Sequence, residues 1–82
     1  MPSVRVLLFD VLRREIGTNE LVLEVAGGAT GADLLGELVD AHEPIARHRP
    51  TIRLAVNRRY VAFETVLEDG DEVALITPVS GG

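Results

Sequence analysis

The sequence predicts a small α+β domain in which one main helix packs on a mixed sheet of four to five strands, followed by an extended C-terminal tail. Its 82 residues and 46% hydrophobic content suit one domain with one core. Apolar residues alternate with period two in several short segments and follow helical spacing in one longer segment. The segments follow the order strand, strand, helix, strand, short strand, strand, which is typical of the α+β class.

The first two strands are expected to pair antiparallel. Residues 4–11 are rich in β-branched and apolar side chains and predict the first strand. Residues 12–19 predict a helical turn and a loop, since Gly17 lies within them. Residues 20–25 alternate apolar and polar side chains, which predicts a second strand with one buried face.

The main helix is predicted over residues 31–43. Thr30 is a suitable N-cap because its hydroxyl can accept a hydrogen bond from the backbone N–H of Asp33. Pro44 disfavours helix at the preceding residue and beyond it. Gly36 weakens the helix, so we expect a close approach of helix to sheet there. Helical spacing places one apolar set on a common face: Leu34, Leu35, Leu38, Val39 and His42.

Three further strands are predicted in the C-terminal half. After an irregular stretch over residues 44–51, residues 52–56 predict the third strand. Residues 57–59 favour a turn, and residues 60–63 a short fourth strand. The Leu-Glu-Asp-Gly-Asp sequence that begins at Leu67 predicts another turn, in which Gly70 takes positive φ.

The last strand is predicted over residues 72–76, and a tail follows it. Pro78 has no backbone N–H, so strand pairing is expected to fail there and the chain to leave the sheet. The expected organisation is a folded domain over residues 1–76 and a flexible Gly-Gly tail over residues 77–82.

Composition excludes several classes of function. The chain has no cysteine, which excludes disulfides, thiolate metal sites and sulfur carried on a side-chain thiol. The net charge of −5 argues against nucleic acid binding, and we interpret Arg58 and Arg59 as solvated surface. No segment approaches the roughly 20 apolar residues that span a bilayer. We therefore expect a soluble cytoplasmic protein with neither nucleic acid nor membrane as a partner.

Candidate chemistry inside the domain is sparse. His42 lies on the apolar helix face, where a structural role is the favoured interpretation. The acidic residues 68–72 lack the spacing of a calcium loop, so no metal site is expected. Residues 27–31 lack both the lysine and the glycine spacing of phosphate-binding loops. No nucleophile lies beside an activating base, and we expect the chain to bind no cofactor.

The best remaining candidate is the end of the chain, Ser80-Gly81-Gly82. Glycine lacks a Cβ, so this tail can enter a slot too narrow for other residues and deliver the Gly82 carboxylate to another protein's active site. Gly81 and Ser80 would form its approach. The competing interpretation is a frayed chain end.

Three segments carry a family resemblance: Ala55-Val56-Asn57, Leu67 to Val73, and Pro78-Val79-Ser80-Gly81-Gly82. They resemble the small subunit of molybdopterin synthase, a sulfur carrier with the ubiquitin-like β-grasp fold. The N-terminal part is similar more loosely, through Val6 to Phe9 and Leu12 to Gly17. The resemblance covers the whole chain, and its most specific part begins at Ala55.

The resemblance implies a mechanism in which the chain is not catalytic alone. An E1-like adenylating enzyme would use ATP to convert the Gly82 carboxylate into an acyl-adenylate. A sulfur donor enzyme would then form a thiocarboxylate. In the synthase large subunit, its sulfur would attack the cyclic pterin precursor to build the molybdopterin dithiolene. This agrees with the absence of cysteine, because sulfur held on the chain terminus needs no thiol.

The resemblance also implies a partner-binding surface. In the family, apolar residues on an exposed sheet face dock both partners, and Phe9, Tyr60 and Ile76 match them here. Pro78 and Val79 match the approach to the tail. Each apolar residue could instead belong to the core, although period-two alternation places Phe9 on the face opposite its buried neighbours. The family often has an aromatic residue and two prolines before the final valine, so tail stiffness and partner fit are expected to differ here.

Three alternatives stay open. A related sulfur carrier could serve thiamin thiazole, tRNA thiolation or cysteine synthesis. A ubiquitin-like protein modifier would form an isopeptide bond through Gly82, although the absence of lysine counts against chains built on itself. A plain interaction domain would tolerate loss of Gly81 and Gly82.

Overall fold

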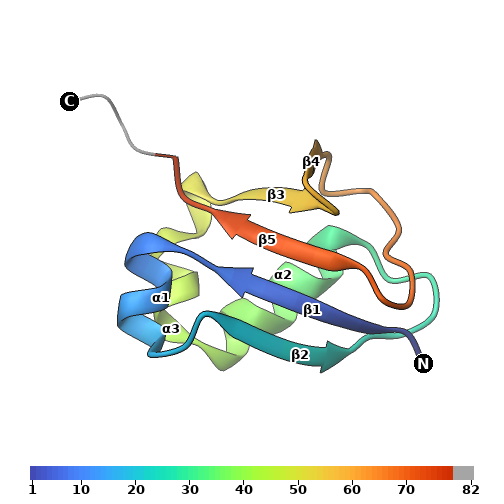
Figure 1. The fold of residues 1–82 in the computed structure, drawn as a ribbon, viewed down its shortest axis with the longest axis horizontal. Helices are drawn as coiled ribbons and strands as arrows, with labels where there is room; N and C mark the ends of the chain where they lie inside the picture. Colours follow the sequence, from blue (N-terminus) through green and yellow to red (C-terminus); the bar gives the residue numbers. More distant parts are fainter. Residues whose placement is uncertain (79–82) are drawn as a thin grey trace.

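Five strands form one mixed sheet in the computed structural model, which describes residues 1–78 (Figure 1). The strands are β1 (Ser3–Leu8), β2 (Glu20–Glu24), β3 (Arg53–Val56), β4 (Arg59–Val61) and β5 (Glu72–Ile76). Their order across the sheet is β2-β1-β5-β3-β4. The two central strands, β1 and β5, are parallel, and every other neighbouring pair is antiparallel. This confirms the predicted mixed sheet and the pairing of its first two strands.

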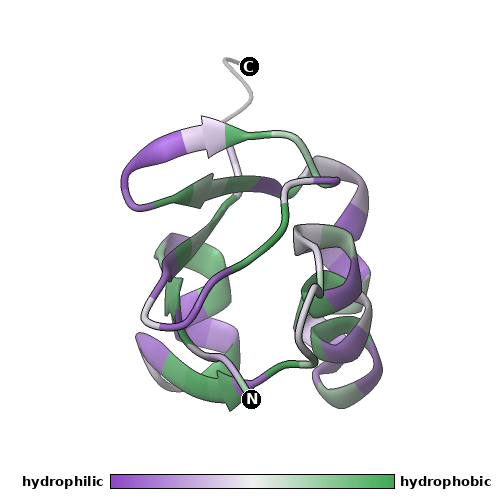
Figure 2. Cartoon of the chain, turned by 90° about the vertical axis from the view of Figure 1, so that its right-hand side faces the viewer, coloured by the Kyte–Doolittle hydropathy of each residue, from purple (hydrophilic) through white to green (hydrophobic). Residues whose placement is uncertain are grey.

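The core lies between the sheet and the main helix, α2 (Gly31–Ala41). Viewed end-on, sheet and helices form two layers that both carry hydrophobic residues (Figure 2). Cross-strand register places buried side chains in rows, and Leu8 and Leu54 both pair with Leu75. The fully buried side chains are Val4, Val6, Leu8, Leu12, Leu34, Leu35, Ile45, Val73 and Leu75. They fix one face of the sheet as internal, which leaves the other face for solvent or a partner.

Helix α2 begins with the predicted cap. The Thr30 hydroxyl accepts from the backbone N–H of Asp33 at 3.2 Å, and the Asp33 carboxylate accepts from the backbone N–H of Thr30 at 3.0 Å. Two further N–H groups of the first turn, on Gly31 and Ala32, donate to the carbonyls of Thr65 and Phe63. The helix start therefore also holds the segment that follows β4.

Thr30→Ala is expected to lower the unfolding free energy by about 1 kcal/mol, because it removes one half of this capping box. Thermal unfolding followed by circular dichroism should show a midpoint about 4–8 °C lower for a domain of this size. The matched control is Thr30→Ser, which keeps the hydroxyl. An unchanged midpoint in Thr30→Ala would contradict a stabilising role for the cap.

The close approach predicted at Gly36 is wrong. Gly36 is exposed, and a Cβ built there would meet nothing within 4 Å. The close approach is at Gly31, where a Cβ would overlap the Leu54 side chain and lie 3.3 Å from the Phe63 carbonyl oxygen. Gly31 thus brings the start of α2 against β3.

The first strand is shorter than predicted and ends at Leu8. Phe9 is the extended N-cap of a helix, α1 (Asp10–Ile16), which takes two residues assigned by the pattern to the strand. Gly17 ends this helix with φ 93°, and its N–H donates to the Arg13 carbonyl at 2.9 Å. The Cβ-free residue suits this left-handed cap.

Pro44 does not lead into an irregular stretch, as the sequence predicted. Helix α2 ends at Ala41, and α3 (Glu43–His48) and a 3₁₀ turn, η1 (Arg49–Thr51), follow. Pro44 lies in the first turn of α3, where its missing N–H costs no helical hydrogen bond. The new helix packs near α1 at the end of the molecule from which the tail leaves (Figure 1).

Candidate functional site

The tail leaves from the middle of the sheet. β5 ends at Ile76 as predicted, and it lies between β1 and β3. Pro78 is exposed and follows the strand directly. Four predicted site residues lie outside the described part of the chain: Val79, Ser80, Gly81 and Gly82.

Three of the five predicted partner-binding residues come together on the outer sheet face, whereas Pro78 does not line the same hollow. Phe9, Tyr60 and Ile76 line one hollow of about 450 Å³. Phe9 is 44% exposed and Tyr60 70% exposed, so neither belongs to the core. Ile76 is half-buried at the end of β5. The structure therefore brings together the residue after β1, the middle residue of β4 and the last residue of β5.

Sequence reasoning missed three residues of this surface, Leu7, Ala55 and Ala74. Register places them in one row with Tyr60, since Leu7 pairs with Ala74, Ala74 with Ala55, and Ala55 with Tyr60. All three line the same hollow. Alternation within each strand indicates the outward face, but only the pairing shows that the residues meet. We call this surface the outer patch, defined by Leu7, Phe9, Ala55, Tyr60, Ala74 and Ile76.

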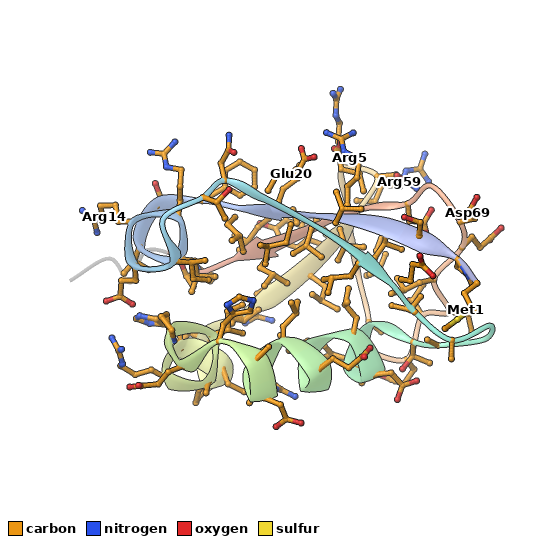
Figure 3. All side chains as sticks on the ribbon, turned by 90° about the horizontal axis from the view of Figure 1, so that it is seen from below. Met1, Arg5, Arg14, Glu20, Arg59 and Asp69 are labelled. Carbon is orange, nitrogen blue, oxygen red and sulfur yellow. The ribbon has the colours of Figure 1, made fainter. Side chains whose placement is uncertain are left out.

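Charged side chains border the outer patch. Arg5 forms ion pairs with Glu20 at 2.9 Å and with Glu72 at 3.5 Å. The hydrogen bond between Arg5 and Glu20 is the main cause that lowers the pKa of Glu20 and raises the pKa of Arg5. Figure 3 shows Arg5 and Glu20 on the side of the sheet away from the helices. Because Arg5 and Glu20 are solvent-accessible, these ion pairs are expected to contribute little to the free energy of unfolding.

A two-residue turn joins β3 to β4, the strand that contains Tyr60. Asn57 and Arg58 have φ of 51° and 72°, as in a type I′ hairpin turn. Asn57 is fixed from both sides, since its amide donates to Asp71 at 3.0 Å and its side-chain oxygen accepts from the Glu72 N–H at 3.1 Å. The predicted turn is confirmed, but β4 begins at residue 59 and ends at residue 61 rather than spanning residues 60–63.

Three arginines line the hollows beside Pro78, together with His48 and the carboxylates of Asp10 and Glu64. Pro78 lines three adjoining hollows, together with Arg53, with Arg49, and with Arg14 and His48. This contrasts with the net charge of −5 for the whole chain. Arginines thus outnumber carboxylates in these hollows, with Arg14, Arg49 and Arg53 against Asp10 and Glu64.

The described residues hold little that resembles an internal active site. Within residues 1–78 there is no buried polar or charged side chain and no group of three potential metal ligands. The same part of the chain has no helix long and apolar enough to cross a membrane. Exposed apolar surfaces such as the outer patch are typical of protein-binding sites.

Comparison with known proteins identifies the family. The model of the ThiS family matches residues 6–82. This range contains β2 to β5 in full and the second half of β1. The chain belongs to the ThiS family. A relative in Chlamydomonas reinhardtii, the molybdopterin synthase sulfur carrier subunit, is 40% identical over 82 residues, which cover 98% of this chain and 99% of the relative.

Solved structures similar to this ThiS family chain share its β-grasp fold. A putative molybdopterin converting factor subunit 1 from Pyrococcus furiosus has a TM-score of 0.86 and 31% identity, covering 96% of this chain and 100% of that one. The small archaeal modifier protein 1 of Haloferax volcanii has a TM-score of 0.83 and 30% identity, with coverage of 96% and 100%.

A solved structure with lower sequence identity is that of a protein–protein complex. It contains subunits 1 and 2 of the molybdopterin-converting factor from Helicobacter pylori, with a TM-score of 0.73 and 23% identity over 98% of this chain and 99% of that one. At this identity the likeness concerns the fold alone. Together these structures confirm the ubiquitin-like β-grasp fold expected from the sequence.

Proposed function

We propose that this chain is the sulfur carrier subunit of molybdopterin synthase. The observation that carries the proposal is the similarity to such a subunit along almost the full length of both chains. The family match also extends through Gly82, so it includes the Gly-Gly end as well as the domain. The domain docks on partner enzymes, and the tail carries the sulfur.

The proposed chemistry takes place at the Gly82 carboxylate. Attack of this carboxylate on ATP, within an E1-like adenylating enzyme, forms an acyl-adenylate and releases pyrophosphate. A sulfur donor then displaces AMP to leave a thiocarboxylate. In the synthase large subunit the thiocarboxylate sulfur forms a carbon–sulfur bond to the cyclic pterin precursor as a carbon–oxygen bond of the precursor breaks, and water then cleaves the acyl–sulfur bond to regenerate the carboxylate. The chain supplies a nucleophilic sulfur without any cysteine of its own.

The outer patch is the proposed docking surface for both the adenylating enzyme and the large subunit. Its apolar centre and charged border match the general anatomy of protein interfaces. Tyr60 and Phe9 are exposed aromatic residues, a type enriched at binding hot spots. Because both enzymes would use one surface, the carrier binds them in turn, and release from one must precede binding to the other.

The test of this function is the intact mass of the protein after incubation with ATP, the adenylating enzyme and a sulfur source. Replacement of one terminal oxygen by sulfur is expected to raise the mass by the difference between the two atoms. A known carrier in the same mixture is the positive control. A mass that stays unchanged while that control responds would exclude the thiocarboxylate mechanism.

A second candidate is a protein modifier, which the likeness to the Haloferax volcanii modifier favours. In that case Gly82 would join to lysines of target proteins through an isopeptide bond. Denaturing gels of cell extract, probed for the chain, would show a ladder of heavier adducts. A single band at the free mass, together with sulfur transfer in the mass experiment, would favour the carrier.

A further inference from the structure

Arg58 occupies a backbone conformation that disfavours its side chain. Its φ of 72° lies in the left-handed region, at the second position of the two-residue turn. Hairpins of this type favour asparagine followed by glycine, because glycine alone enters that region without steric cost. Asn57 fits the preference at the first position, and Arg58 departs from it at the second.

No hydrogen bond or ion pair within the described residues offsets this unfavourable conformation of Arg58. Within residues 1–78, Arg58 takes part in no side-chain hydrogen bond or ion pair, whereas Arg5 and Arg47 each form two ion pairs. The turn is fastened through Asn57, whose amide reaches Asp71. A residue that breaks a local rule without an internal benefit indicates a function outside the fold.

The position of Arg58 indicates what that function is. Its side chain lines the same hollow as Phe9, Tyr60 and Ile76, at the edge of the outer patch. The hollow also contains Glu72, but that carboxylate is engaged by Arg5 at 3.5 Å. Among the described residues the guanidinium of Arg58 has no ion-pair partner, and it lies beside an apolar surface.

A protein that covers the outer patch would take this guanidinium partly out of water. Such burial is unfavourable unless an acceptor replaces the lost hydration. A carboxylate is the natural complement, because the planar guanidinium fork matches its two oxygens. The restricted backbone of the turn also limits the directions in which the side chain can project.

We propose that Arg58 is a partner-recognition residue that pairs with an aspartate or glutamate of the protein docked on the outer patch. The inference rests on the proposed function for the identity of that protein. It adds a charged contact to the apolar surface and explains why the turn carries arginine in place of glycine.

The test is titration calorimetry of purified synthase large subunit with the wild-type carrier and three variants. Arg58→Gly is expected to bind about tenfold more weakly and to lose salt dependence, since it removes one charged contact. Its thermal midpoint is expected to stay level or rise, because glycine relieves the left-handed strain. Arg58→Lys, which keeps the charge, is expected to bind more tightly than Arg58→Gly. Arg59→Ala is the matched control, since it removes the same charge from a side chain outside the hollow.

The outcomes separate this inference from the proposed function. Wild-type affinity in Arg58→Gly, while the wild type binds the large subunit, would overturn the role of Arg58 and leave the carrier function standing. Equal losses in Arg58→Gly and Arg59→Ala would also overturn it, because general charge would then account for the effect. Absence of binding by the wild type would overturn both.

Discussion

Deletion of Gly81 and Gly82 is expected to abolish molybdopterin formation and to leave the β-grasp domain folded. The truncated chain would end at Ser80, about 7 Å short of its normal reach, since each extended residue spans about 3.5 Å. Its terminal carboxylate would also carry a side chain, which a slot made for glycine excludes. The measurement is conversion of the cyclic precursor by reconstituted synthase, and activity should fall to that of a reaction without carrier.

The truncation needs two controls. Thermal unfolding should be unchanged, because the deletion removes none of the hydrogen bonds and buried side chains found within residues 1–78. Ser80→Ala keeps the length and both glycines, and it is expected to retain most activity. If the truncated protein still supports cofactor synthesis, the carrier hypothesis is wrong and an interaction domain becomes the better description.

Tyr60→Ala is expected to weaken binding to the synthase large subunit by at least about 30-fold, the effect of losing an aromatic hot spot worth about 2 kcal/mol or more. Tyr60 is 70% exposed and pairs with Ala55 in the middle of the outer patch. Removal of its ring deletes the most exposed side chain of the outer patch. Calorimetric titration of the two proteins measures the change.

The matched control for Tyr60→Ala is Val22→Ala. Val22 is 63% exposed on β2 and lines no part of the hollow. Its removal should leave binding close to that of the wild type. Similar losses in the two variants would contradict a localised docking surface, and no loss in Tyr60→Ala would place the partner elsewhere on the carrier. The adenylating enzyme should show the same order of affinities, because it is proposed to use the same patch.

Local chemical signals explain which elements were predictable. The α2 cap could be predicted because Thr30 and Asp33 stand three residues apart, and the positive φ at Gly70 because of its turn sequence. Helix α3 was missed because Pro44 ends one helix pattern and equally suits the first turn of the next. The close approach was predicted at Gly36 and lies at Gly31, because it depends on a neighbour, Leu54, that is distant in the sequence.

The site was predictable only in part. Phe9, Tyr60 and Ile76 came from a family resemblance, and the structure brings them to one hollow. Their neighbours Ala55 and Ala74 are small residues that carry no signal until the strand register is known. Arg58 was interpreted as solvated surface, since its unusual backbone angle follows from the two-residue length of the hairpin.

The central place of β5 has a mechanical consequence. A partner that grips the tail pulls on β5 along its own axis, with β1 bonded on one side and β3 on the other. Such a load shears both ladders at once, whereas a pull on an edge strand such as β2 or β4 could peel it bond by bond. The hydrogen-bond ladders of β5 with β1 and β3 therefore resist the force when the tail is withdrawn from a partner.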